Sequence, residues 1–389
     1  MKNKKVFVGL SGGVDSAVSA ALLKAQDYDV TGVFIRIAIS GYPCPAALDR
    51  IDAMRVAAHL KILFREIDLS KEYESQVFKP SIEEFAKGRT PNPDTLCNEK
   101  IKFGIFFDYC ISHGADFVAT GHYAKIVQSQ QKQIERSVSQ AGGPRGSEFS
   151  VENYATPRDL VSVKLQVATD ENKDQTYFLW AVPETALRKT LFPVGNLKKT
   201  DVRALAKKFG LPNASRPDSQ GLCFLGDIGI DDMLAREVPQ KSGNVLGESG
   251  EVIGRHHGAI HYTIGQRHGF ELFSVSRRAE SSGRRPHFVV AKDIEANTIT
   301  VSAKRLPANK RSTLVTLADT NWIGPVEAGP CEVRFRYRQK LIPARLLSTK
   351  GDVRVILNEP HFVPEGQSLV LYRAERCLGG GVISNVTLQ

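Results

Sequence analysis

Apolar runs and amphipathic segments alternate along the first 120 residues of the chain. The continuous apolar runs predict short buried strands at residues 4–10, 30–36, 62–69 and 115–120. Between them, apolar side chains recur every three or four residues, which predicts helices at residues 14–24, 48–60, 73–87 and 100–112. Such alternation favours a doubly wound parallel sheet with its ligand site at the carboxyl ends of the strands.

This alternation stops at about residue 128. Residues 128–160 are rich in Ser, Gln, Gly and charged side chains, a composition that favours a flexible insertion. Helical spacing returns at residues 174–188 and 200–209. We therefore predict a single α/β domain over residues 1–218, with the insertion inside it.

A different pattern begins at about residue 286. Short segments in which apolar and polar positions alternate are separated by turn residues, at 288–290, 298–301, 332–337, 353–357 and 368–372. This pattern predicts a small all-β barrel over residues 286–389. Residues 219–285 are Gly-rich and mixed in pattern, and we predict a small central linking domain there. The expected fold class is therefore α/β followed by β.

Composition adds two expectations. The chain of 389 residues is 42% hydrophobic, without a run long enough to span a membrane, and residues 1–6 lead directly into the first predicted strand. We therefore expect a cytoplasmic protein. The formal net charge of +10 favours a polyanionic partner such as nucleic acid, although excess charge also serves solubility.

The turn between the first strand and the first helix has the composition of a phosphate-binding loop. It comprises Gly9, Leu10, Ser11, Gly12, Gly13, Val14, Asp15 and Ser16. Glycines let the backbone approach phosphate oxygens, and the following helix offers free N–H groups and the positive end of its dipole. The sequence contains neither the Gly-x-x-x-x-Gly-Lys-Ser/Thr motif of P-loop kinases nor a Gly-x-Gly-x-x-Gly motif at this place.

This loop resembles the SGGxDS signature of the PP-loop ATP pyrophosphatases. The resemblance implies that residues 1–218 form a catalytic domain that cleaves ATP between the α- and β-phosphates and transfers AMP to an acceptor oxygen. It also implies that Asp15 helps to hold Mg²⁺, a role that suits a carboxylate beside phosphates. The acceptor stays open at this point, because amino acids, purines and tRNA bases are all used in this superfamily.

Two cysteines lie in loops with unusual surroundings. Cys97 ends a proline-rich loop, residues 88–98, next to a predicted helix start, where the helix dipole favours the thiolate. Asp94 precedes it by three residues and is suited to move a proton. Cys223 lies in a short loop flanked by glycines, residues 218–226. The alternative for each cysteine is a small buried apolar residue, which is common for intracellular proteins.

Together with the loop at residues 11–16, these motifs resemble the bacterial tRNA-specific 2-thiouridylases of the MnmA type along nearly the whole chain. The other matching stretches are residues 88–103, 119–123, 172–178, 191–195, 218–226, 261–267, 336–339, 364–368 and 377–381.

That resemblance implies ATP-dependent thiolation of the wobble uridine, position 34, in the tRNAs for Lys, Glu and Gln. The C2 oxygen is adenylated, and sulfur then replaces it. By the same resemblance, Cys223 carries a persulfide received from a cysteine desulfurase or a sulfur-relay protein. Cys97 is its partner in a transient disulfide, and Asp94 is the general acid/base. The chemistry is sound, since AMP is a good leaving group and a persulfide is a soft nucleophile.

The resemblance also implies binding residues. ATP contacts are expected from residues 9–16, Ile35 and Gly121, and target-base contacts from Asn92, Pro93 and Asp94. Expected tRNA contacts are His122, Lys173, Asp174, Gln175, Arg336, Tyr337 and Gln367. In addition, period-two spacing predicts a basic ladder of Arg334, Arg336 and Arg338 on one strand face, suited to phosphates. The alternatives are a solvated charged face for the ladder and a core histidine for His122.

Some features stay open or differ from the family. Residues 35–44 lack the acidic, Trp-bearing character usual there, so the surroundings of Cys44 are undetermined, and the insertion is longer than the family norm. The six cysteines contain no Cys-x-x-Cys, so the spacing does not favour an iron–sulfur cluster, and Cys110, Cys331 and Cys377 are expected to be structural. The alternatives in function are another PP-loop adenylating enzyme and an inactive tRNA-binding scaffold.

Overall fold

The computed structural model describes residues 3–42, 46–130, 161–218, 230–238, 241–273, 286–303 and 311–389. Its N-terminal unit is built on a parallel five-stranded sheet in the order β3-β2-β1-β4-β7. The strands are β1 (Lys5–Gly9), β2 (Asp29–Arg36), β3 (Leu63–Asp68), β4 (Phe117–Ala119) and β7 (Thr190–Leu191). The predicted parallel sheet is thus confirmed, and the chain reverses its direction of travel between β1 and β4, where such folds bind ligands.

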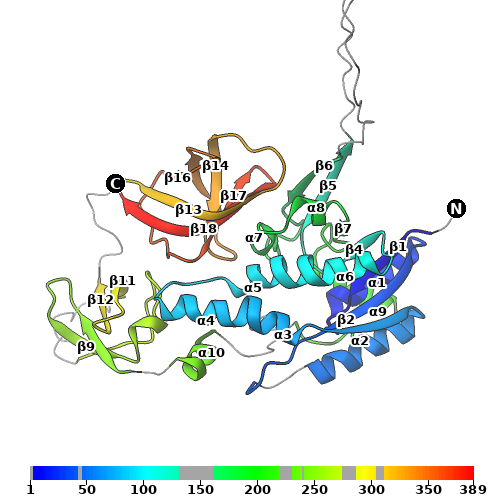
Figure 1. Ribbon diagram of the computed structural model, residues 1–389, viewed down its shortest axis with the longest axis horizontal. Helices are drawn as coiled ribbons and strands as arrows, with labels where there is room; N and C mark the ends of the chain where they lie inside the picture. Colours follow the sequence, from blue (N-terminus) through cyan, green and yellow to red (C-terminus); the bar gives the residue numbers. More distant parts are fainter. Residues whose placement is uncertain are drawn as a thin grey trace, which may run out of the picture.

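Helices cover both faces of this sheet (Figure 1). One face packs against α1 (Val14–Ala25), α2 (Ala46–Leu60) and α9 (Lys199–Lys208). The other packs against α3 (Ser70–Tyr73), η1 (Glu74–Phe78), α4 (Lys79–Ala86), η2 (Cys97–Ile105) and α6 (Phe106–Ser112). The expected helix at residues 100–112 begins earlier, at Pro93 of α5 (Pro93–Leu96), because Asn92 caps it by accepting a hydrogen bond from the Thr95 amide.

Two expectations for the N-terminal unit were wrong in detail. The single helix expected at residues 174–188 is two short helices, α7 (Thr176–Leu179) and α8 (Glu184–Leu187), because Pro183 stands between them and cannot continue a helix. The flexible stretch expected from about residue 128 is still strand as far as Gln130, since β5 (Lys125–Gln130) pairs with β6 (Val161–Gln166). Residues 131–160 lie outside the described part of the chain.

The middle unit has its own sheet, in the order β10-β9-β8-β12-β11. Its described elements are α10 (Ile230–Glu237), β8 (Gly243–Leu246), β9 (Val252–His256), η3 (Ala259–His261), β10 (Glu271–Leu272), β11 (Phe288–Asp293) and β12 (Thr298–Ser302). The expected start of the C-terminal barrel at residue 286 therefore differs from the structure. β11 and β12 belong to the middle unit, because β12 pairs in parallel with β8.

The C-terminal unit is an antiparallel barrel closed by the pairing of its first and last strands, β13 and β18. The strands are β13 (Thr313–Trp322), β14 (Gly329–Arg334), β15 (Ile342–Leu346), β16 (Val353–Leu357), β17 (Ser368–Arg373) and β18 (Arg376–Leu388). Alternate positions point inward and form an apolar core, which confirms the predicted barrel. β18 also pairs with β6, so the barrel is joined to the N-terminal unit. None of the helices in the described ranges combines the length and hydropathy that a membrane crossing needs.

Candidate active site

The loop between β1 and α1 adopts a conformation that only glycine accommodates at its centre. Gly12 has a φ of +78°, and a Cβ placed there would lie 2.5 Å from the backbone oxygen of Asp49. The Ser16 hydroxyl braces the loop by donating to the Gly13 carbonyl at 3.1 Å and accepting from the Ser11 amide at 3.2 Å. The loop is therefore fixed before any ligand arrives.

A cavity of about 550 Å³ opens at the carboxyl ends of β1, β2 and β4. Gly121, just after β4, lets this wall close on the loop, since a Cβ there would lie 2.7 Å from the Ser16 amide nitrogen. The cavity brings together most of the residues expected to bind ATP. Its walls include Gly9, Leu10, Ser11, Gly13, Val14, Asp15, Ser16, Ile35 and Gly121.

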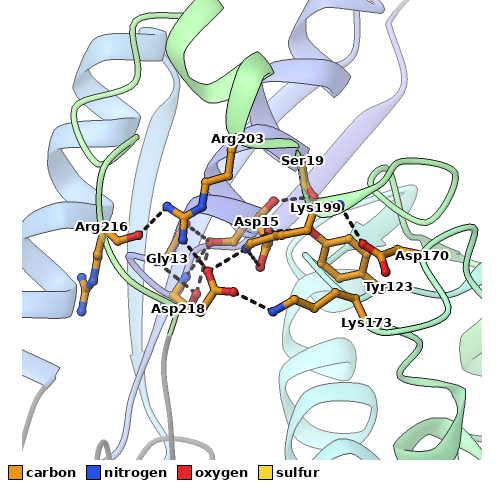
Figure 2. Close-up of polar contacts among 12 residues, drawn as sticks. Gly13, Asp15, Ser19, Tyr123, Asp170, Lys173, Lys199, Arg203, Arg216 and Asp218 are labelled. Carbon is orange, nitrogen blue, oxygen red and sulfur yellow. Dashed lines mark hydrogen bonds and ion pairs between the residues drawn. The ribbon is translucent and has the colours of Figure 1, made fainter. Parts of the chain in front are cut away.

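A group of ion pairs borders this cavity, and the sequence did not reveal it. Figure 2 shows Lys199 between two carboxylates: its Nζ lies 2.7 Å from Asp15 and 2.9 Å from Asp218. Asp218 also pairs with Lys173 at 2.7 Å and Arg203 at 2.5 Å. Three cations thus converge where Asp15 of the loop faces the cavity. We call Lys173, Lys199 and Arg203 the cation cluster.

The charges of the cluster control the protonation of their neighbours. Burial alone would raise the pKa of Asp218, but hydrogen bonds from Lys173 and Lys199 hold this pKa below its usual value. Burial and the adjacent Asp15 carboxylate raise the pKa of Tyr123, whose hydroxyl donates to Asp15 at 2.8 Å. At neutral pH Asp218 is therefore an ionised carboxylate and Tyr123 a neutral phenol.

The helix that begins at Pro93 forms a second wall. Asp94, Asn98, Lys102 and Phe106 follow each other at intervals of four residues, and all of them line the cavity. The stretch η2 is π-helical, with i→i+5 bonds and more residues per turn than an α-helix. Residues four apart therefore stay on one face across α5, η2 and α6. Phe106 is the last residue of this row, and its ring packs beside Gly9.

The two cysteines expected to transfer sulfur are placed differently. Cys97 lies on the helix beside Asp94, but its side chain is fully buried in the core beneath the sheet and does not line the cavity. Cys223 and Cys44 lie outside the described residues. Cys110, Cys331 and Cys377 are buried, as expected for structural cysteines. In Cys110 and Cys377, burial raises the pKa of the thiol to about 12.

His122 lies in the cavity wall and is not positioned on the surface to meet a tRNA backbone. Its ring packs against the rings of Phe103 and Phe192, and its Nδ1 lies 2.7 Å from the Thr120 hydroxyl. Burial, helped by the charge of Lys102, lowers the pKa of His122 well below its ordinary value, so the ring is neutral. Burial thus favours the alternative of a core histidine, although one that borders the cavity.

The expected basic ladder of Arg334, Arg336 and Arg338 was wrong. β14 ends at Arg334, and Arg338 has a positive φ of 60° in the turn that follows, so period-two spacing does not apply. The Arg334 side chain is only 11% exposed and pairs with Asp174 at 3.0 Å. The expected tRNA contact of Asp174 was also wrong, because its side chain is 2% exposed and accepts bonds from Arg334 and Thr176.

The remaining expected tRNA contacts lie near the site. Lys173, Gln175 and Tyr337 line the cavity itself. Arg336 is exposed and donates to the Ile264 carbonyl at 3.3 Å. Gln367 joins the barrel to the N-terminal unit: it accepts from the Tyr177 hydroxyl at 3.0 Å and donates to the Pro91 carbonyl at 3.3 Å.

The contacts of Asp15 bear on a site for Mg²⁺. In the described ranges, no group of three or more His, Cys, Asp or Glu side chains is arranged to hold a metal. Both oxygens of Asp15 accept from Lys199, and one also accepts from Tyr123. Mg²⁺ that arrives with a nucleotide needs only one or two protein carboxylates besides phosphate oxygens, and Asp15 offers one at the loop.

Comparison with known proteins supports the division into three units. Family models match in succession: the tRNA methyl transferase HUP domain over residues 4–227, the tRNA methyl transferase PRC-barrel domain over residues 231–303, and the Aminomethyltransferase beta-barrel domain over residues 312–383. The second of these spans β11 and β12, in agreement with the sheet pairing.

Two curated relatives match along their whole length. A tRNA-specific 2-thiouridylase MnmA from Francisella philomiragia is 38% identical over 98% of this chain and 100% of its own. Another, from Bacillus subtilis, is 37% identical over 99% of this chain and 96% of its own. Among solved structures, the U34-tRNA thiolase NcsA from Methanococcus maripaludis with its [4Fe-4S] cluster matches at 18% identity over 58% of this chain and 63% of that chain. Its TM-score of 0.34 is too low to carry an argument.

Proposed function

Because the chain belongs to the tRNA-specific 2-thiouridylase (MnmA) family, we propose that it thiolates C2 of the wobble uridine, position 34, in tRNA at the expense of ATP. The observation that carries this proposal is the cavity in which the nucleotide loop, Asp94 and Tyr337 all meet. Both half-reactions act on the C2 carbonyl group of the uridine, the first on its oxygen and the second on its carbon, so both need that group within one enclosed site.

The first half-reaction is adenylation. The C2 oxygen of the uridine attacks the α-phosphorus of ATP, and pyrophosphate leaves. The loop supplies backbone N–H groups, and the cation cluster supplies the positive charge that the departing pyrophosphate requires. Asp218 partly offsets the charge of that cluster before ATP binds, so phosphate oxygens would replace a carboxylate that already accepts from the same donors. Mg²⁺, held at Asp15 with the phosphates, would lower the negative charge of the polyphosphate.

The second half-reaction is sulfur transfer. The terminal sulfur of a Cys223 persulfide is transferred to C2, and AMP leaves with the former uridine oxygen. The Cys97 thiolate attacks the inner sulfur, so the S–S bond of the persulfide is replaced by a Cys97–Cys223 disulfide. A thiol reductant must then reopen that disulfide. Asp94, on the cavity wall, takes up the proton of the persulfide S–H as its sulfur attacks C2. Since Cys97 is buried, this step requires the helix at Cys97 to shift toward the cavity.

The partners follow from this chemistry. The substrates are tRNAs with a wobble uridine, those for Lys, Glu and Gln, and the sulfur donor is a cysteine desulfurase or a relay protein. The excess of basic side chains suits a polyanionic substrate. Arg336 is exposed beside the cavity-lining Tyr337, which supports a role for it in binding this substrate. The steps proposed above use no iron–sulfur cluster.

The test is mass spectrometry of tRNA nucleosides after incubation of the full chain with unmodified tRNA, ATP, Mg²⁺ and a persulfide donor. Wild type should form 2-thiouridine, while Cys223→Ala and Cys97→Ala should form none and still release pyrophosphate. An absence of 2-thiouridine with wild type, or full activity of Cys223→Ala, would refute the proposal. Pyrophosphate release on a different substrate, insensitive to both cysteine variants, would instead support another adenylating enzyme.

The cation cluster has a test of its own. Lys199→Met removes the central cation and should weaken ATP binding by about 10- to 100-fold, the effect of losing one or two charge-assisted hydrogen bonds. Lys208→Met, at an exposed position on the same helix, is the matched control and should bind ATP like wild type. Equal ATP affinity in Lys199→Met and wild type, measured by calorimetry, would exclude the role of this lysine.

A further inference from the structure

Asn98 is a polar residue of the cavity wall to which the proposed reaction gives no role. It lies four residues beyond Asp94 on the face of the α5–η2–α6 helix that borders the cavity, and both residues line that cavity. The Asn98 residue is only 3% exposed. A buried amide in a ligand cavity needs a reason, because polar groups withdrawn from water cost free energy unless they are paired.

The hydrogen bonds of this amide are half complete. Its Nδ2 donates to the Phe178 backbone carbonyl at 3.1 Å. This contact fixes the orientation of the amide, since the reverse orientation would set two oxygens against each other. The Asn98 Oδ1 is shielded from solvent and has no hydrogen-bond partner among the residues that the structure describes. A fixed acceptor without a partner is complemented by a ligand that brings an N–H donor.

The surroundings suit a flat ligand. The Phe178 and Tyr337 rings lie 4.7 Å apart and both line the cavity. Aromatic faces of this kind stack with nucleobases that have left their helix. The backbone carbonyl of Phe178 orients the Asn98 amide, and the ring of Phe178 borders the cavity. Phe178 therefore positions both the Asn98 Oδ1 acceptor and the surface on which a base stacks.

We propose that Asn98 Oδ1 accepts the N3–H of the target uracil and thereby selects uridine over cytidine. This inference rests on the function proposed above. Uridine and cytidine share the C2 oxygen that reacts, so the reaction centre alone does not separate them. They differ at N3, which carries a hydrogen in uridine and a lone pair in cytidine. A site built to hydrogen-bond one group strongly rejects an analogue that lacks it.

The test removes the proposed hydrogen bond in two ways, once by changing the protein and once by changing the substrate. Wild type and Asn98→Ala are each supplied with ATP, a persulfide donor and tRNA that carries either uridine or 3-deazauridine, in which C–H replaces N3–H, at position 34. On uridine, Asn98→Ala should lower kcat/KM by about 10- to 100-fold, the loss of one good hydrogen bond. On 3-deazauridine, the variant and wild type should agree within threefold. Equal losses on both substrates would overturn the proposal, because they would indicate a structural role.

Thr95→Val is the matched control. Thr95 lies on the same helix, is buried, and its Oγ1 also has no partner among the described residues, but it does not line the cavity. This variant should retain the wild-type rate on uridine. If Asn98→Ala does not fold, the wild-type protein provides the test. A tRNA with cytidine at position 34 should then react at least 100-fold more slowly than the tRNA with uridine. Similar rates for the two tRNAs would overturn the proposal. Absence of thiolation of uridine by wild type would refute the proposed function instead.

Discussion

At the scale of single residues, the site depends on positions where no other side chain fits. Gly12 has a left-handed backbone conformation, and a Cβ added there would lie 2.5 Å from the backbone oxygen of Asp49. Asn213 donates to the Gly12 carbonyl at 2.7 Å and holds this peptide in place. The Gly-rich motif predicted the loop, whereas Asn213, which supports it, lies 201 residues further along the chain.

Replacement of Gly12 tests whether steric crowding at the loop, rather than backbone conformation alone, controls ATP binding. Gly12→Ala should weaken ATP binding by about 10- to 100-fold, because relieving an overpacked contact displaces the loop at a cost of roughly 1–3 kcal/mol. Gly114→Ala is the control, since Gly114 has a φ of +88° but no atom within 4 Å of an added Cβ. It should lower stability slightly and leave the ATP affinity, measured by calorimetry, unchanged. Equal affinities for ATP in both variants would contradict this account of the loop.

At the scale of elements, buried charges fix how strands and loops meet. The Arg334–Asp174 pair joins the end of β14 to the loop before α7, and Asp174 also accepts from the amide of Ala168. Burial keeps this pair unscreened by solvent. The expected surface role of Arg334 was wrong because period-two spacing identifies a strand face but neither where the strand ends nor the element that covers it.

Breaking this buried pair should destabilise the protein strongly. Asp174→Ala leaves the Arg334 guanidinium buried and unpaired, so the free energy of unfolding should fall by about 3–5 kcal/mol. Adding Arg334→Met should recover part of that loss, because the isolated charge is gone. The exposed pair Lys79–Glu74 is the control, and Lys79→Ala should cost less than about 1 kcal/mol in urea unfolding. If the free energy of unfolding of Asp174→Ala/Arg334→Met is no higher than that of Asp174→Ala, the unpaired arginine has no net cost and this account is wrong.

The middle unit should show a pH dependence from one buried lysine. Burial lowers the pKa of Lys292 from 10.5 to about 8, and its Nζ donates to the Tyr262 carbonyl at 2.7 Å. The unfolded chain binds this proton more tightly, so the stability that Lys292 contributes should rise as pH increases from 8 to 10.5. Compared with Lys292→Met, thermal melts of wild type should gain stability across this range. Parallel pH profiles of the two proteins would disprove the shift.

At the scale of the whole molecule, the barrel completes the active site. The turn before β17 contacts the loop that leads to Asp94: the Thr90 amide donates to the Glu365 carbonyl at 2.9 Å, and Gln367 donates to the Pro91 carbonyl. These contacts join segments that lie far apart in the sequence. Tyr337 of the barrel also lines the cavity. The barrel thus helps to position the loop that carries Asp94.

Loss of this bridge should affect catalysis more than nucleotide binding. Gln367→Ala removes the contacts to Tyr177 and Pro91, so the loop that carries Asp94 loses its support from the barrel. We expect kcat for 2-thiouridine formation to fall by about 10-fold, in line with the sensitivity of catalysis to small misplacements, while the Kd for ATP stays unchanged. If tRNA affinity falls and kcat at saturating tRNA does not, Gln367 serves as a direct tRNA contact.

Local patterns along the chain determined much of the fold. Apolar runs and helical spacing predicted the parallel sheet and its helices, and the Gly-rich loop indicated the nucleotide site. These features depend on neighbours within one turn or one strand, which the sequence records directly. The extra first turn at Pro93 was missed, although the Asn92 cap and the proline are legible signals.

The tertiary structure alone decided the rest. It brought Lys199, Arg203 and Asp218 to Asp15, buried Cys97 beside Asp94, and assigned β11 and β12 to the middle sheet. Burial, ion pairing and strand partnership depend on which distant segments pack together, and residue spacing carries no record of that. For this protein the sequence therefore determined the elements and the nucleotide loop. Long-range packing decided which charges and which helix face surround that loop.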